Sequence, residues 1–175
     1  IHGVFLWCSC WLSRPSGLQI SKFMAMTNSI DLLVTVLNQL KLKYTLQENE
    51  SVSFKWFRVR YRKVDFDIAV DKRWKFLMVT YFGFDRVPIN DSDYLLKIYQ
   101  VIDNVNFGMP AKLVLSGTDQ DYGEVHAIQD LYWIPEIPDL GKYLKKSFGM
   151  LMYIMDYYFE KKDELVGMTN ITSEC

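Results

Sequence analysis

Three stretches of the chain repeat apolar residues every three or four positions, the spacing of one buried helix face. The first predicts a helix over residues 29–41. The second predicts a helix that begins near residues 90–92, where three N-cap candidates stand, and stops at Gly108. The third predicts a last helix with Pro138 in its first turn and Gly167 as its latest end. Its apolar stripe consists of Leu140, Leu144, Phe148, Leu151, Met155 and Tyr158.

Between the first two helices the pattern changes to alternation at every second residue, which is typical of strands with one buried face. Apolar residues alternate with polar ones up to Trp56, and the alternation then shifts by one position at Phe57. We interpret this shift as a β-bulge. Further strands are predicted over residues 74–82, 111–116 and 123–134, and the first of these, apolar on both sides, is expected to be central.

Charged residues fix the register of one predicted hairpin. If the chain turns at residues 62–63, oppositely charged side chains face each other across the two strands, and apolar side chains face each other on the opposite side of the pair. The expected pairs are Arg60 with Asp65, Arg58 with Asp67, Val59 with Phe66 and Phe57 with Ile68. Both faces therefore favour the same register.

The element order is α-β-β-β-α-β-β-α, which predicts an α+β fold with an antiparallel five-stranded sheet and helices packed on one face. The other face must then be solvated or covered by another chain. We assign residues 26–167 to a single domain and residues 168–175 to a flexible tail. Residues 1–25 are expected to lie outside the domain, either as a non-core segment or upstream of a start at Met24 or Met26.

The high number of aromatic residues also favours a sheet face that another chain covers. Eleven Phe, eleven Tyr and five Trp are more rings than a core of this size easily holds, so some rings are expected on a binding surface. The net charge of −1 gives no bulk attraction for nucleic acid or anionic membranes. All three cysteines lie near the ends, which favours a reducing, cytoplasmic setting, and no apolar run approaches the roughly 20 residues that span a bilayer.

Motifs for catalysis and metal binding are weak. The sequence contains no phosphate-binding loop, dinucleotide fingerprint, serine-hydrolase elbow or zinc-protease motif, so we expect no enzyme activity and no cofactor. Cys8 and Cys10 with His2 lack the second ligand pair of a structural zinc site. His126 is expected to be structural, and the acidic residues 119–124 are expected to form a hairpin turn and not a calcium loop.

The run KWFRVRYRK at residues 55–63 offers a nucleic-acid alternative, because aromatic strands among arginines can stack single-stranded bases. Asp65 and Asp67 are placed to neutralise two of its arginines, and the run lacks the glycines of the usual RNA-binding strand. We therefore expect a solvated hairpin face more than a site for single-stranded RNA.

Several local features, taken in order, resemble one known family. The second helix ends in YQVIDNVN, with Asn104 and Asn106 before the next strand. The strand pair KLVLSGTDQDYGEVHAIQDLYW turns at an acidic, glycine-containing loop, and the last helix LGKYLKKSFGMLMYIMDYYF is long. Over residues 28–165 this order is similar to the YbjN-type family of small bacterial proteins, with a type III secretion chaperone-like fold. The chain departs from the pattern in its heavier aromatic load and its N-terminal segment.

The resemblance implies a non-enzymatic, often dimeric domain that holds segments of other proteins or acts in regulation, with no catalytic residues. We expect a protein partner or a second copy of the chain and no membrane partner, with single-stranded RNA at residues 55–63 as the less favoured alternative. The alternative is a small ligand-binding or enzymatic α+β domain with a pocket between helices and sheet. The predicted interaction surface comprises Trp56, Trp74, Phe76, Met152, Met155, Tyr158 and Phe159.

Overall fold

The computed structural model describes residues 28–47, 54–71, 75–117 and 120–171, with side chains as far as Leu165. The predicted α+β class is confirmed, but the sheet has six strands where five were expected. The additional strand arises because the first extended segment is divided in two. In chain order the elements are α2 (Ser29–Gln39), β1 (Lys43–Gln47), β2 (Phe54–Tyr61), β3 (Val64–Asp71), β4 (Phe76–Pro88), α3 (Ser92–Gly108), β5 (Lys112–Gly117), β6 (Tyr122–Tyr132) and α4 (Leu140–Ile171).

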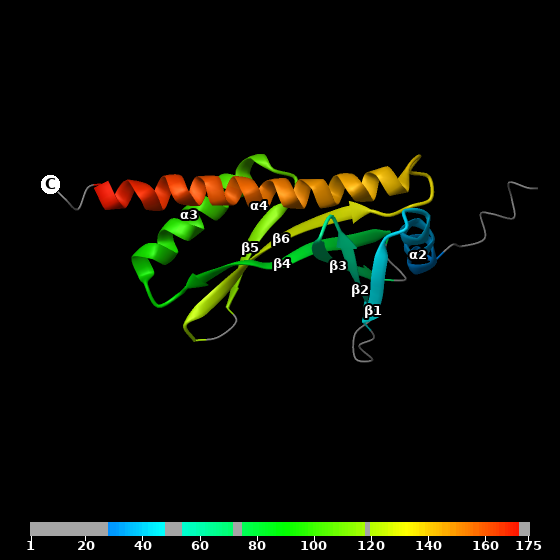
Figure 1. Cartoon of the computed structure of the whole chain (residues 1–175), viewed down its shortest axis with the longest axis horizontal. Coiled ribbons are helices and arrows are strands. Elements are labelled where there is room, and N and C mark those ends of the chain that lie inside the picture. The colour runs from blue at the N-terminus through cyan, green and yellow to red at the C-terminus, as the bar shows by residue number, and fades with distance from the viewer. Residues whose placement is uncertain (1–27, 48–53, 72–74, 118–119, 172–175) are drawn as a thin grey trace, which may run out of the picture.

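The strands follow the spatial order β1-β2-β3-β4-β6-β5, and every neighbouring pair is antiparallel. Pairing is uneven across the sheet. β4 and β6 pair along most of their length, whereas β3 and β4 pair only where Asp67–Val70 meets Leu77–Thr80. We call this short β3–β4 pairing the seam. It joins a three-stranded unit, β1-β2-β3, to a second unit, β4-β6-β5 (Figure 1).

The register predicted for the β2–β3 hairpin is confirmed. Arg58 lies opposite Asp67 and Arg60 opposite Asp65, and the strands turn at Arg62. Arg62 and the residue after it both adopt positive φ angles, 49° and 68°. This is the twist that two-residue hairpins require, although neither residue is the glycine or asparagine that usually supplies it.

The expected bulge at Trp56 and Phe57 is wrong. β2 pairs without interruption with both β1 and β3, so its side chains simply alternate between the two faces of the sheet. The shift in the sequence pattern arose because β2 carries aromatic residues on both faces. The register shift lies instead in β4, between Tyr81 and Asp85, where Gly83 has a φ of 57°.

A polar side chain caps the start of each described helix, and at α2 the Asn28 side-chain oxygen accepts a hydrogen bond of 2.9 Å from the N–H of Ile30. The Asp91 carboxylate accepts a hydrogen bond of 3.0 Å from the backbone N–H of Tyr94 at the start of α3. At the start of α4 the carboxylate of Asp139 accepts one of 2.8 Å from the N–H of Lys142, so Pro138 precedes the cap and is not in the first turn. The expected end of α4 at residue 167 is also wrong, because the helix continues to Ile171. One glycine weakens a helix by only about 1 kcal/mol.

Asn106, near the end of α3, ties this helix to β5. Its amide donates to the carbonyl of Leu113 at 3.0 Å, and its side-chain oxygen accepts from the N–H of the same residue at 2.6 Å. An amide side chain can satisfy both backbone groups of one residue in this way. The ending YQVIDNVN thus fixes the angle at which the chain leaves the helix.

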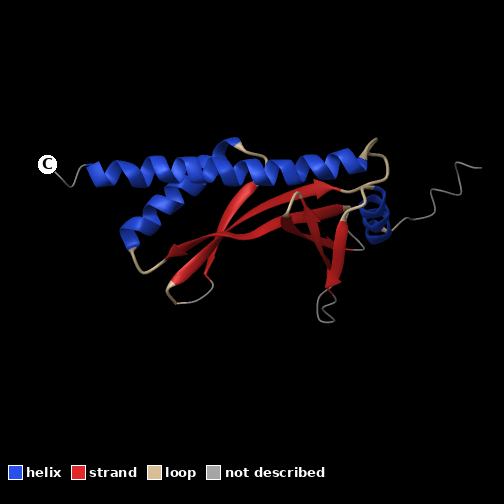
Figure 2. Ribbon diagram, viewed as in Figure 1, coloured by secondary structure: helices blue, strands red, loops and turns tan. Residues whose placement is uncertain are grey.

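The helices cover one face of the sheet. α4 runs along the sheet with α3 beside it, and α2 packs against β3 and α4 near the three-stranded unit (Figures 1 and 2). The core lies between these helices and the inward side chains of the strands. Its largest enclosed side chains are Trp133, Tyr158, Phe57, Phe66, Phe148, Leu33, Leu37, Ile68, Leu77, Ile98, Leu144 and Leu151.

A buried polar cluster anchors the second half of α4. Asp85 of β4 accepts hydrogen bonds from the Tyr158 hydroxyl at 2.7 Å and the Lys162 ammonium at 2.5 Å. Burial, then the hydrogen bond and charge of Asp85, raises the pKa of Tyr158, so this phenol stays protonated. The cluster holds α4 against the strand at the bulge.

Candidate functional site

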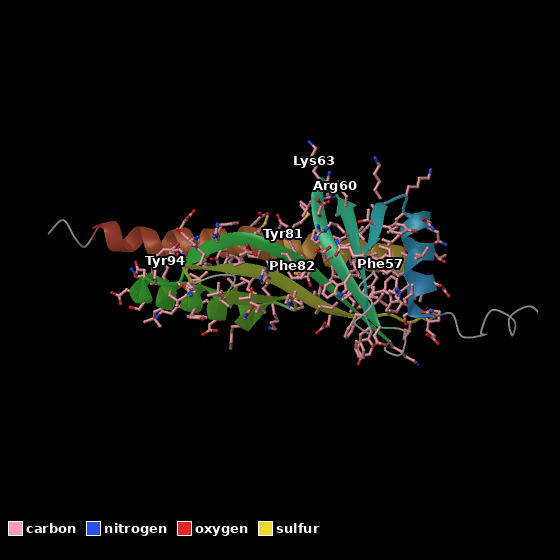
Figure 3. All side chains as sticks on the ribbon, turned by 90° about the horizontal axis from the view of Figure 1, so that it is seen from below. Phe57, Arg60, Lys63, Tyr81, Phe82 and Tyr94 are labelled. Carbon is pink, nitrogen blue, oxygen red and sulfur yellow. The ribbon has the colours of Figure 1, made fainter. Side chains whose placement is uncertain are left out.

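No helix of the described residues covers the other face of the sheet, which we call the open face (Figures 2 and 3). The register aligns its side chains in rows that run across the strands. One row crosses four strands and consists of Trp56 on β2, Ala69 on β3, Met78 on β4 and Asp130 on β6. With strands about 4.8 Å apart, the two ends of this row lie about 14 Å from each other.

This row crosses a hollow of about 380 Å³ on the open face. The hollow straddles the seam, because Trp56 and Ala69 belong to the three-stranded unit and Met78 and Asp130 to the other. Ala69 has a single methyl group between the large side chains of Trp56 and Met78, which leaves the space that forms the hollow. Its described lining residues are Phe54, Trp56, Ala69, Phe76, Met78 and Asp130.

Aromatic rings continue around the hollow and remain accessible. Phe76 is 40 % exposed and packs against Tyr132, which is 61 % exposed, with ring centroids 4.6 Å apart. On the other side of the hollow, the ring centroids of Trp56 and Phe82 lie 6.3 Å apart. Phe82, labelled in Figure 3, is 44 % exposed. Several large accessible rings around one hollow are unusual for a surface that contacts only water.

The arginines on this face are neutralised by their neighbours. Arg58 forms two hydrogen bonds of 3.0 Å with Asp67, and Arg60 forms bonds of 2.7 and 2.6 Å with Asp65. Hydrogen bonding to Asp67, and then its charge, raises the pKa of Arg58, while the hydrogen bonds of Arg60 lower the pKa of Asp65. A second hollow, of about 360 Å³, is lined by Arg58 and Asp67 of the first pair and by Asp65 of the second. The two guanidinium groups are thus occupied within the sheet.

His126 lies on β6 beneath the Phe82 ring and is almost fully buried. Its Nδ1 accepts a hydrogen bond of 2.8 Å from the N–H of Gly83, so the proton of the neutral ring is on Nε2 and is donated to Ser116 Oγ at 2.6 Å. A histidine that activates a serine must instead accept the hydroxyl proton. Burial lowers the pKa of His126 and keeps it neutral. The geometry agrees with the expected structural role.

The predicted interaction residues do not form one surface. Trp56 and Phe76 lie together on the open face, and Trp74 lies outside the described residues. The others are on α4, on the opposite side of the sheet (Figure 1). Tyr158 is fully buried and is corrected to a core residue, because its ring packs against Phe84 and its hydroxyl binds Asp85. Met152, Met155 and Phe159 are half-buried.

Most residues of the hollow were not predicted from the sequence. Phe54, Ala69, Met78 and Asp130 were not recognised as members of one site, and Phe82 and Tyr132 were not assigned to its rim. The available signal was the alternation in β2, where Phe54 and Trp56 occupy the face opposite to Phe57.

Within the described residues, no group of three or more histidine, cysteine or acidic side chains is placed to hold a metal ion. Cys8, Cys10 and His2 lie outside the described part of the chain. None of the helices in the part of the chain that the structure describes is both long and apolar enough to cross a membrane.

Comparison with known proteins supports the fold. No protein-family model matches the sequence, and no curated protein matches it. Among solved structures, the chain is similar to the crystal structure of YbjN from E. coli, a proposed transcription regulator, with a TM-score of 0.50 and 13% sequence identity. The match covers 72% of this chain and 87% of YbjN. At this identity the likeness shows a common fold.

Proposed function

We propose that this chain is a non-enzymatic protein-binding domain that holds a segment of a partner protein, or of a second copy of itself, on the open face of its sheet. The observation that carries the proposal is the hollow among Phe54, Trp56 and Phe76, with Tyr132 and Phe82 accessible beside it. Buried rings contribute most of the binding energy in many protein interfaces. The likeness of fold to YbjN is consistent with this proposal.

A protein partner explains this face better than nucleic acid does. Binding to a nucleic-acid backbone draws on unpaired cationic groups that replace counterions. Here Arg58 and Arg60 each form two hydrogen bonds with an aspartate of the adjacent strand, and the chain as a whole has a net charge of −1. Apolar and aromatic contacts are the larger remaining source of affinity.

Site-specific photo-crosslinking in the source cell tests the proposal. A photoreactive phenylalanine analogue replaces Phe76, at the hollow, or Tyr153, which is 54 % exposed on α4 and serves as the matched control. We expect defined protein adducts from position 76 and not from position 153. The same adducts from both positions, or none from position 76, would contradict the proposal. Nucleic acid as the main adduct would favour the alternative that residues 55–63 bind RNA.

The mass of the purified chain in solution identifies which partner occupies the face. If the partner is a second copy, the chain is a dimer at micromolar concentration, and Phe76→Ser with Tyr132→Ser converts it to a monomer. If the partner is another protein, the chain is a monomer with accessible apolar surface, and the same two substitutions reduce the binding of a hydrophobic dye. A monomer that binds no dye would count against both forms of the proposal.

A further inference from the structure

The hollow on the open face contains one negative charge that the described chain does not pair. Asp130 is the only ionisable residue among its described lining residues. Within the described part of the chain no hydrogen bond or salt bridge involves its carboxylate. Asp65 and Asp67, on the same face, instead accept two hydrogen bonds each from an arginine. Among the described residues, this carboxylate therefore differs from the two paired aspartates of the same face.

The position of Asp130 leaves it accessible from the side of the open face. It lies opposite Met78 on β4, in the row that ends at Trp56. On the outer side of β6, β5 reaches only as far as Lys112, which lies opposite Ile128. No described strand therefore flanks Asp130 on that side, and its side chain is exposed.

Rings and a carboxylate in one hollow select for a particular chemistry. The faces of aromatic rings attract cations, most strongly for tryptophan, and a nearby carboxylate adds a full opposite charge. A neutral apolar group would remove water from the Asp130 carboxylate without replacing its hydrogen bonds, and an anion would be repelled. A group with an apolar stem and a cationic end satisfies both the rings and the carboxylate.

We propose that the hollow takes a lysine or arginine side chain from an extended segment of a partner protein, with the stem between Trp56 and Phe76 and the charge at Asp130. This inference rests on the proposed function and specifies the chemistry of the partner. The row between Trp56 and Asp130, about 14 Å long, accommodates one long side chain lying across it.

A partner chain explains the surroundings of the hollow, which a free organic cation does not. In an extended segment, side chains two positions apart point to the same side and lie about 7 Å from each other. Residues two positions before and after the cation would therefore reach beyond the hollow. Tyr132 and Phe82 offer accessible rings there, on the β6 side and along β4.

Peptide binding to the purified full chain tests the inference. The probes are arrayed hexapeptides in which one central position is Lys, Arg, norleucine or Glu and the flanking positions vary among apolar residues. Norleucine keeps the lysine stem and lacks the ammonium group. The best Lys peptide and its norleucine twin are then titrated in solution, and the methyl resonance of Met78 reports whether they enter the hollow.

We expect the Lys or Arg peptide to bind about fivefold to thirtyfold more tightly than the norleucine twin, with a smaller ratio at high salt. Asp130→Asn, which preserves shape, should reduce this ratio to near one. Ala69→Leu, which fills the hollow, should prevent binding of both peptides. Asp103→Asn, an exposed change on α3, is the matched control and should leave the ratio unaltered.

The outcomes separate this inference from the proposed function. If the norleucine peptide binds as tightly as the Lys peptide, or if Asp130→Asn leaves the ratio unchanged, the cation inference is wrong while the protein-binding face stands. If free tetramethylammonium shifts the Met78 methyl resonance and no peptide does, the occupant is a small cation and the partner segment is excluded. If neither probe binds, the cation inference is wrong, and the crosslinking at position 76 and the mass in solution decide the proposed function.

Discussion

The buried cluster around Asp85 allows a prediction whose size can be calculated. The Lys162 ammonium lies 2.5 Å from the Asp85 carboxylate, and the two side chains are 17 % and 13 % exposed. At an effective dielectric of 20 their attraction is about 7 kcal/mol, most of which is offset by removing both charges from water. Removal of one member of a buried pair costs about 3–5 kcal/mol, because the other charge remains without a partner.

We expect Asp85→Asn to reduce the free energy of unfolding by about 3 kcal/mol, the lower end of that range, since both groups retain some contact with water. Tyr158→Phe removes only one hydrogen bond to the same carboxylate and should cost about 1 kcal/mol. Urea unfolding at pH 7 measures both values, with Asp103→Asn as the exposed control, expected within about 0.5 kcal/mol of the original chain. A loss below about 1 kcal/mol for Asp85→Asn would refute the reasoning.

The same cluster predicts the effect of alkaline pH. Burial alone lowers the pKa of Lys162, but the hydrogen bond and charge of Asp85 outweigh it, so this pKa is raised, as is that of Tyr158. Groups with folded-state pKa values above their unfolded values stabilise the fold fully below about pH 10 and lose this contribution as the pH rises further. The difference between the original chain and Asp85→Asn should therefore shrink above pH 10.

Three further predictions concern single side chains. Thr80 is fully buried and its hydroxyl has no hydrogen-bond partner among the residues that the structure describes, so Thr80→Val should raise the free energy of unfolding by about 1 kcal/mol in urea titrations. Asp91→Ala removes the cap of α3 and should lower the free energy of unfolding by about 1 kcal/mol in the same titrations. An unchanged free energy of unfolding would show that the cap does not stabilise the helix. Burial lowers the pKa of His126, so its contribution is complete above about pH 6.5 and falls as the pH drops. The stability gap between the original chain and His126→Gln should narrow from pH 7 to pH 5, and a constant gap would show that the contribution of His126 does not depend on its protonation.

Local chemistry in the sequence predicted much of the fold. Opposite charges at Arg58 and Asp67 and at Arg60 and Asp65 set the β2–β3 register correctly, because only one register pairs both sets. The apolar stripe predicted for α4 correctly identified the buried face of this helix, because Leu144, Phe148 and Leu151 of the stripe are all buried. These signals are local, since each depends on residues a few positions apart in one helix or hairpin.

The errors arose where position depends on distant parts of the chain. Aromatic residues on both faces of β2 produced an apparent shift at Phe57, and only the pairing with β1 and β3 shows that no bulge exists. The actual bulge at Gly83 accommodates the pairing of β4 with β6, which follows much later in the sequence.

The candidate site was hidden for the same reason. Asp130 joins Trp56 only through the registers of three successive strand pairs, one of which connects strands that are separated by a helix and another strand. In the sequence Asp130 is one of 21 acidic residues with no distinguishing neighbours. The aromatic excess predicted that a ring-lined surface exists, but its location required the complete sheet.

The seam between β3 and β4 gives the hollow a mechanical property. Since Trp56 and Ala69 stand on one side of this short pairing and Met78 and Asp130 on the other, any widening of the seam pulls the hollow apart. An occupant that binds only while the two units are together stabilises that arrangement, by an amount that grows with the ratio of its concentration to its Kd. Bound segments should thus slow amide exchange at residues 67–70 and 77–80 more than elsewhere in the sheet, because an occupant that contacts both units resists their separation.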